Sequence, residues 1–269
     1  MKIVISTVII FLMFSIPAHS RLADSTVSHI SLKKQLEVGE DLTYVVKYAF
    51  LNLGEIRFKI VGKEIIKGNA VFKTVAYIDS YKGLPFVTIH QVYESFIDSS
   101  YFPLSFVGTM MDDDTTYTEY SFIGDSVIHV VKGNPNTKQV SVDSLINVNK
   151  GFQDGLSILY FARMNTGRDT TLFVPCFVNE RQEIATLNIY SDNEEIEIDA
   201  VDYGIDCLKL DGSTNFVSVY GFTGEFEGCF SNDKYSIPIV ARMNVLIGHV
   251  TLELISWNLN DWKPPEYKD

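Results

Sequence analysis

The sequence predicts a mainly β protein: a large curved antiparallel sheet, a sandwich or an open barrel, with one covering helix over about residues 154–165. Two observations favour this class. Apolar and polar residues alternate with period two from Asp41 onward, and turn residues such as Lys67-Gly68-Asn69 separate the alternating runs. A single segment, residues 149–163, has helical spacing instead.

The first group of strands comes before residue 150. Tyr44, Val46, Tyr48 and Phe50 share one face of the first run. Asn52-Leu53-Gly54 then forms a hairpin turn into the second run. By the same pattern we expect strands over residues 43–50, 56–60, 71–79, 86–97, 101–111, 116–122, 127–131 and 138–142.

The predicted helix has recognisable signals at both ends. Asp154 can accept backbone N–H bonds at its start, and Gly167 can close its end. An arginine near the C-terminus complements the helix dipole. A helix of this kind either packs as a structural element or gates a cavity. The stripe that it presents consists of Leu156, Leu159, Tyr160 and Arg163.

Strands resume after the helix, and a proline marks one of them. Pro238 lies inside a strand pattern, so that strand is an edge or carries a bulge there. A sheet edge is a natural place for a partner strand to add. The second group of strands is expected over residues 171–178, 183–190, 194–201, 207–210, 218–230, 235–243 and 248–257.

The chain divides into four segments. Residues 1–20 are predicted to be a signal peptide and residues 21–38 a polar lead-in. A single β-rich domain is expected over residues 39–257, which could consist of two halves that meet near residue 150. Residues 258–269 are expected to form a loose tail.

The first twenty residues have the pattern of a secretory signal. Lys2 precedes an apolar run over residues 3–16, and Ala18-His19-Ser20 supplies small residues for cleavage. The run is too short to cross a bilayer, which needs about 20 apolar residues. We therefore expect a periplasmic or secreted protein with no transmembrane segment after the signal is removed.

The net charge and the cysteines limit which partners and which chemistry we expect. The formal charge of −12 would repel nucleic acid. Cys207 and Cys229 lie on adjacent predicted strands and could form a disulfide, with Cys176 free. Alternatively, all three cysteines are small core residues. The sequence contains no Cys-x-x-Cys pair, the motif that would indicate redox or zinc chemistry.

No catalytic or metal motif stands out. The sequence lacks Gly-x-Ser-x-Gly and His-Glu-x-x-His. His90, His129 and His249 lie on separate strands, and we expect isolated histidines rather than metal ligands. The run from Asp112 to Asp114 fits a solvated turn better than a calcium loop. We expect no catalytic residue, metal or cofactor.

Several short motifs, in order along the chain, resemble those of one family. They are Gly39 to Tyr44, Leu53 to Ile56, Asp154 to Arg163, Gly224 to Asp233 with Ile237-Pro238, and Leu246 to Leu254. Over about residues 36–256 the chain is similar to an exported bacterial family known as domain of unknown function three-one-zero-eight. The resemblance implies an exported, mainly β protein of Gram-negative bacteria, with a Bacteroidetes-like leader. It implies no activity.

Three functions follow from these patterns. We expect a non-catalytic binding or carrier module for an apolar or amphipathic envelope molecule, such as a lipid or glycolipid. The alternatives are an assembly factor that binds an envelope protein through a sheet edge, and a carboxylate-dependent envelope hydrolase. The candidate ligand-binding residues, on the helix and the concave face, are Tyr44, Tyr48, Phe58, Asp154, Tyr160 and Arg163.

Overall fold

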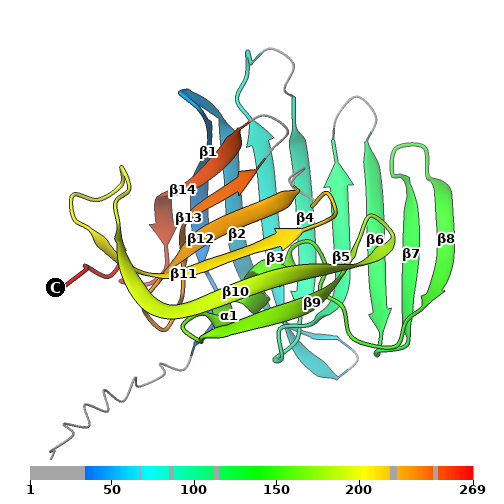
Figure 1. Ribbon diagram of the computed structural model, residues 1–269. Coiled ribbons are helices and arrows are strands. Elements are labelled where there is room, and N and C mark those ends of the chain that lie inside the picture. The colour runs from blue at the N-terminus through cyan, green and yellow to red at the C-terminus, as the bar shows by residue number, and fades with distance from the viewer. Residues whose placement is uncertain are drawn as a thin grey trace, which may run out of the picture. The chain divides into compact units, whose positions relative to one another are not determined.

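Antiparallel pairing joins the strands of this chain into a single sheet (Figure 1). A computed structural model describes residues 34–66, 68–84, 88–111, 115–218, 223–244 and 248–268. The predicted signal peptide and the Asp112–Asp114 turn lie outside these residues. Within them the structure has fourteen strands and one helix, which confirms the mainly β class.

Eight strands precede the helix and six follow it. The strands before the helix are β1 (Asp41–Tyr48), β2 (Leu51–Ile66), β3 (Asn69–Ser80), β4 (His90–Ile97), β5 (Pro103–Met110), β6 (Thr116–Ile123), β7 (Val127–Asn134) and β8 (Gln139–Asn147). After the helix, α1 (Ser157–Asn165), come β9 (Thr170–Val178), β10 (Arg181–Ile196), β11 (Ile205–Thr214), β12 (Gly224–Ser231), β13 (Pro238–Asn244) and β14 (His249–Asn258).

The strand order follows the chain with one exception. Consecutive strands pair from β1 to β8 and from β9 to β14, and β1 also pairs with β14. The two strand groups that meet near residue 150 are therefore halves of one sheet. Among the described strands the sheet does not close, so β8 and β9 are its two edges.

The two halves of the sheet face each other around the helix. Figure 1 shows β2 to β8 side by side, with β9 to β13 crossing in front of them and α1 between. Contacts join the halves, because the Tyr120 ring on β6 packs edge-on against Phe177 on β9 at 4.9 Å between centroids. The Tyr120 hydroxyl also donates to the Glu180 carboxylate at 3.0 Å. Apolar residues from both halves form one buried core.

Three predictions about the strands need correction. The expected hairpin turn Asn52-Leu53-Gly54 lies inside β2, and the turn between β1 and β2 is at Ala49 and Phe50. The expected strand 183–190 and the first residues of the expected strand 194–201 form one strand, β10, whose pairing with β11 shifts register between Ile189 and Asn193. Residues 197–201 lie after the end of this strand. The shift interrupts the alternation and imitates a turn. Pro238 is the first residue of β13, an interior strand, and the register with β12 shifts next to it. The bulge alternative for Pro238 is correct and the edge alternative is wrong.

The helix α1 begins three residues after Asp154, the residue that caps it. α1 covers Ser157–Asn165, three residues shorter at its N-terminus than predicted. The Asp154 carboxylate still accepts hydrogen bonds from the backbone N–H groups of Leu156 and Ser157, both at 2.7 Å, so the predicted capping is confirmed. Gly167 follows the helix with φ of +78°, a conformation that glycine adopts without strain.

The C-terminal tail is held to the sheet rather than loose. The backbone N–H of Asp206 donates to the Pro265 carbonyl, and that of Tyr267 donates to the Gly204 carbonyl, each at 2.8 Å. The Trp262 indole packs edge-on against Trp257 and donates to the Asp233 carboxylate at 2.6 Å. These anchors join residues that are distant in the sequence, so the polar composition of the tail does not indicate them.

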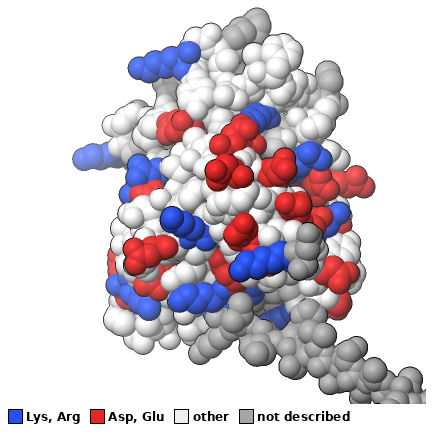
Figure 2. Space-filling view, turned by 90° about the vertical axis from the view of Figure 1, so that its left-hand side faces the viewer, with Lys and Arg blue, Asp and Glu red and all other residues white. Residues whose placement is uncertain are grey.

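Several charged side chains on the outer surface form ion pairs. Lys47 bridges Asp199 and Glu253, at 3.0 Å and 2.7 Å. Figure 2 shows acidic and basic side chains interspersed over one side of the molecule. That side therefore offers no continuous basic patch to a polyanion.

Two glycines of β2 make a matched test of sheet packing. A Cβ atom on Gly54 would lie 2.1 Å from the Asp79 carbonyl oxygen, whereas a Cβ on Gly62 meets nothing within 4 Å. We expect Gly54→Ala to lower the free energy of unfolding by about 1–3 kcal/mol, because the β2–β3 pair must separate locally. Gly62→Ala should change it by less than about 1 kcal/mol. Urea unfolding measures both, and equal effects would contradict the close approach.

Candidate functional site

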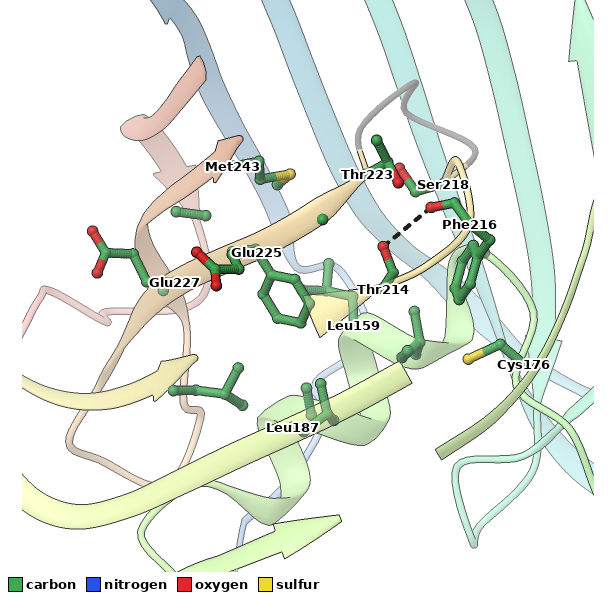
Figure 3. Close-up of a pocket in the computed structure, with 18 of the residues that line it drawn as sticks. Leu159, Cys176, Leu187, Thr214, Phe216, Ser218, Thr223, Glu225, Glu227 and Met243 are labelled. Carbon is green, nitrogen blue, oxygen red and sulfur yellow. Dashed lines mark hydrogen bonds between the residues drawn. The ribbon is translucent and has the colours of Figure 1, made fainter. Parts of the chain in front are cut away.

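An apolar pocket lies between the helix and the second half of the sheet (Figure 3). Its volume is about 180 Å³, and its walls come from α1 and from strands β9 to β13. For comparison, an engineered apolar cavity of about 150 Å³ stays dry and binds benzene. The pocket is therefore large enough for one ring or a short alkyl segment.

Each wall is built from apolar residues that the local structure turns inward. The helix contributes Ile158, Leu159 and Ala162. The strands contribute alternate residues, because every second side chain of a strand faces the same side. The main strand residues are Cys176, Val178, Leu187, Leu210, Phe226, Phe230, Ala241 and Met243.

Strand β12 shows how the sequence makes room. Phe226 and Phe230 point into the pocket, and Gly228 lies between them on the same face. A Cβ atom at Gly228 would have no neighbour closer than 3.5 Å. The missing side chain thus leaves space that the surrounding residues do not fill.

The two carboxylates of β12 belong to the other face of the sheet. Glu225 and Glu227 alternate with the inward residues, and the Glu227 carboxylate accepts from Arg242 on β13 at 2.9 Å. Figure 3 shows Glu227 on the far side of β12 from Leu159. Both glutamates adjoin the pocket because they lie next to its inward-facing residues in β12, and their carboxylates point away from it.

Asp154 is a buried carboxylate among the residues that line the pocket. It is fully buried, and its second carboxylate oxygen accepts from the Ser95 hydroxyl on β4 at 2.6 Å. Burial raises the pKa of Asp154 to about 6, although the hydrogen bonds from Ser95, Ser157 and Leu156 oppose the rise. Both oxygens are thus engaged in fixing the start of α1.

Cys176 presents a thiol to the same pocket. It is fully buried on β9, and burial raises the pKa of its thiol to about 12. The thiol donates weakly to the Val174 carbonyl at 3.4 Å. A thiol that stays protonated is a poor nucleophile, so Cys176 serves as a small apolar wall residue.

A second buried cluster lies on the opposite face of the helix. Arg163 donates to both carboxylate oxygens of Glu40, at 2.7 Å and 2.8 Å, and both side chains are buried. It also donates to the backbone carbonyls of Tyr235 and Ser236. Burial lowers the pKa of Arg163, but the charge and hydrogen bonds of Glu40, together with the nearby tyrosines, outweigh it and raise the pKa overall. This cluster ties α1 to the segments before β1 and β13.

The sequence-predicted ligand residues divide between these two places. Asp154 lines the apolar pocket. Tyr44 and Tyr160 join the Arg163 cluster: the Tyr44 hydroxyl donates to the Pro238 carbonyl at 2.7 Å, and the Tyr160 ring lies 5.4 Å from the Arg163 guanidinium. Phe58 packs against Tyr44 in the core, and Tyr48 packs at the rim of that core. The aromatic residues of this set thus pack inside the protein, and the buried Tyr160 hydroxyl has no hydrogen-bond partner among the described residues.

The cysteines are free thiols, so the possible Cys207–Cys229 disulfide is not formed. In the β11–β12 pair, Cys207 lies opposite Ser231 and Cys229 lies opposite Lys209. The two cysteines are diagonal neighbours with Cα atoms about 7–8 Å apart, beyond the usual reach of a disulfide. Both are buried, which agrees with the alternative that they are small core residues.

The histidines do not converge. His90 hydrogen-bonds Asp79, and His129 hydrogen-bonds Asp143 at 2.8 Å on another strand. Within the described ranges, no three His, Cys, Asp or Glu residues are placed to share a metal ion. Nor does any helix in those ranges have the length and apolarity needed to span a bilayer.

Of the predicted cap and stripe of the helix, Asp154 and Leu159 line the pocket. Sequence reasoning did not assign the other wall residues to a site, although one signal was present. Ile158, Leu159 and Ala162 lie on one side of α1, and Leu156 and Tyr160 are buried on the other. A helix that is apolar on two sides is buried on both. Leu156, Tyr160 and Arg163 of the predicted stripe form the anchoring face of the helix, whereas Leu159 belongs to the neighbouring face that lines the pocket.

These features define a class: an open, curved antiparallel sheet that folds around one helix and leaves an apolar pocket beside it. The chain belongs to the family described as protein of unknown function (DUF3108), whose model matches residues 43–255. This finding confirms the resemblance seen in the sequence motifs.

The fold is similar to that of a solved structure. It is the crystal structure of a beta-barrel-like protein of domain of unknown function DUF1849 from Brucella abortus, with a TM-score of 0.54 and 11% identity. The match covers 82% of this chain and 98% of that one. No curated protein matches this chain.

Proposed function

We propose that this protein is a binding or carrier module for an apolar or amphipathic molecule, and that it works without catalysis. The apolar pocket between α1 and β9–β13 carries the proposal. Burying alkyl groups there is favourable by about 0.8 kcal/mol per CH₂ group. We further propose a periplasmic or secreted location and an envelope lipid or glycolipid as ligand, on the basis of the signal-like residues 1–20.

The hydrolase alternative has less support from the site. A raised carboxylate pKa is one mark of an active site, and Asp154 has it. Both of its oxygens, however, are occupied by Ser95, Leu156 and Ser157. Three of the roughly four acceptor sites of this carboxylate are therefore used inside the protein. Burial is sufficient to account for its raised pKa.

Filling the pocket from the helix side tests the proposal. Ile158 lines the pocket and is half-buried, so Ile158→Trp should block it without a large strain. Octan-1-ol binding is measured by isothermal titration calorimetry on the mature protein. We expect the wild type to bind octanol, and Ile158→Trp to bind it at least about tenfold more weakly, which is about 1.4 kcal/mol.

The matched control is Phe161→Trp on the same helix. Phe161 is also half-buried, but it packs against Phe102 and does not line the pocket. This variant should bind octanol like the wild type. Circular dichroism confirms that all three proteins are folded. Equal binding by Ile158→Trp and the wild type, or no binding by the wild type, would overturn the proposal.

A further inference from the structure

The described residues that line the pocket supply no positive charge to receive an anionic head group. No Lys, Arg or His is found among the described residues that line it. The nearest lining carboxylates either face away, as Glu225 and Glu227 do, or are engaged, as Asp154 is. An anion that enters would lose its water without gaining a counter-charge.

The helix N-terminus gives no substitute for a positive charge. Free N–H groups at the start of a helix attract anions. In α1 the N–H groups of Leu156 and Ser157 already donate to Asp154. The site that would bind a carboxylate or phosphate is therefore filled by the protein's own carboxylate.

One end of the pocket is polar and uncharged. Thr214, Ser218 and Thr223 gather there, away from Leu187 (Figure 3). The Thr214 hydroxyl donates to the Phe216 carbonyl at 3.1 Å, so its oxygen lone pairs can accept a hydrogen bond from a ligand. A hydroxyl head suits this end, and its alkyl chain would lie between Leu159, Leu187 and Phe226.

We propose that the pocket selects a single-chain amphiphile with an uncharged, hydroxyl-bearing head over one with a charged head. The inference rests on the proposed function and names the ligand class of the same site. The pocket volume of about 180 Å³ fits a segment of about seven carbon atoms, by scaling from benzene in a cavity of about 150 Å³.

Three ligands of equal chain length test the preference. Octan-1-ol, octanoate and octylammonium are titrated at pH 7.5 into the wild-type mature protein by isothermal titration calorimetry. We expect octanol to bind at least about tenfold more tightly than either ion. Octanoate or octylammonium binding as tightly as octanol would overturn the inference and leave the carrier function standing. If none of the three binds, the proposed function itself fails.

An added charge at the polar end gives a second test. Thr214→Lys places an ammonium group inside the pocket, and Ser213→Lys places the same charge on the exposed opposite face of β11. We expect Thr214→Lys to strengthen octanoate binding about tenfold and Ser213→Lys to change it less than about twofold, because a charge in water is screened. Equal effects of the two variants would show that net charge, and not the pocket lining, sets the preference.

Discussion

Replacing Arg163 with methionine is expected to lower the free energy of unfolding by about 3–5 kcal/mol. The change leaves Glu40 as a buried carboxylate without its bidentate partner, and removes the hydrogen bonds to Tyr235 and Ser236. For a domain of this size the melting temperature should fall by roughly 10 °C. Urea unfolding and thermal scans measure the two quantities.

Arg242→Met is the matched control, because Arg242 also pairs with a glutamate, Glu227, but at the exposed surface. An exposed ion pair contributes about 0–1 kcal/mol. The double variant Glu40→Gln/Arg163→Met should recover part of the loss, since it removes the unpaired charge. Similar losses for Arg163→Met and Arg242→Met would show that the buried pair does not anchor the helix.

The second large expected effect is that Asp154 makes the free energy of unfolding depend on pH. The folded protein holds the pKa of this carboxyl at about 6, above its ordinary value of 3.8. Between about pH 4 and pH 6 the folded state therefore binds more protons than the unfolded state, and the free energy of unfolding falls as the pH rises. The full effect is about 3 kcal/mol.

Asp154→Asn isolates this contribution. The amide oxygen can still accept from Leu156 and Ser157, and the amide NH₂ can donate to the Ser95 hydroxyl. Relative to the wild type, the variant should gain stability as the pH rises from 4 to 7. Asp261→Asn, at an exposed position, is the control and should follow the wild type. A pH-independent difference between wild type and Asp154→Asn would contradict the raised pKa.

Most of the fold was predictable because strand alternation is a local signal. Aromatic and β-branched residues at every second position, as in Tyr44 to Tyr48, indicate the strands and their hairpin order. The pairing of β1 with β14 was not predictable, since it joins residues about 200 positions apart and no local pattern encodes it. Irregular pairing inside β10 likewise imitated a turn.

The site was less predictable than the fold. Asp154 was found because capping is local, but the partner of Arg163 is Glu40, 123 residues earlier. The pocket depends on which side of α1 faces β9–β13, and on the space beside Gly228. Both depend on packing between segments that are distant in the sequence, which the residue pattern alone does not record.

The pairing of β1 with β14 also constrains how the chain folds. These two strands form the seam between the halves of the sheet, and they lie near opposite ends of the family-matched region. During synthesis β1 is made before the other described strands, and almost the whole domain must be synthesised before its partner β14 exists. Long-range pairing of this kind slows folding, because the loop must close before the contacts form. Completion of the sheet is therefore a late event that requires an intact C-terminal strand.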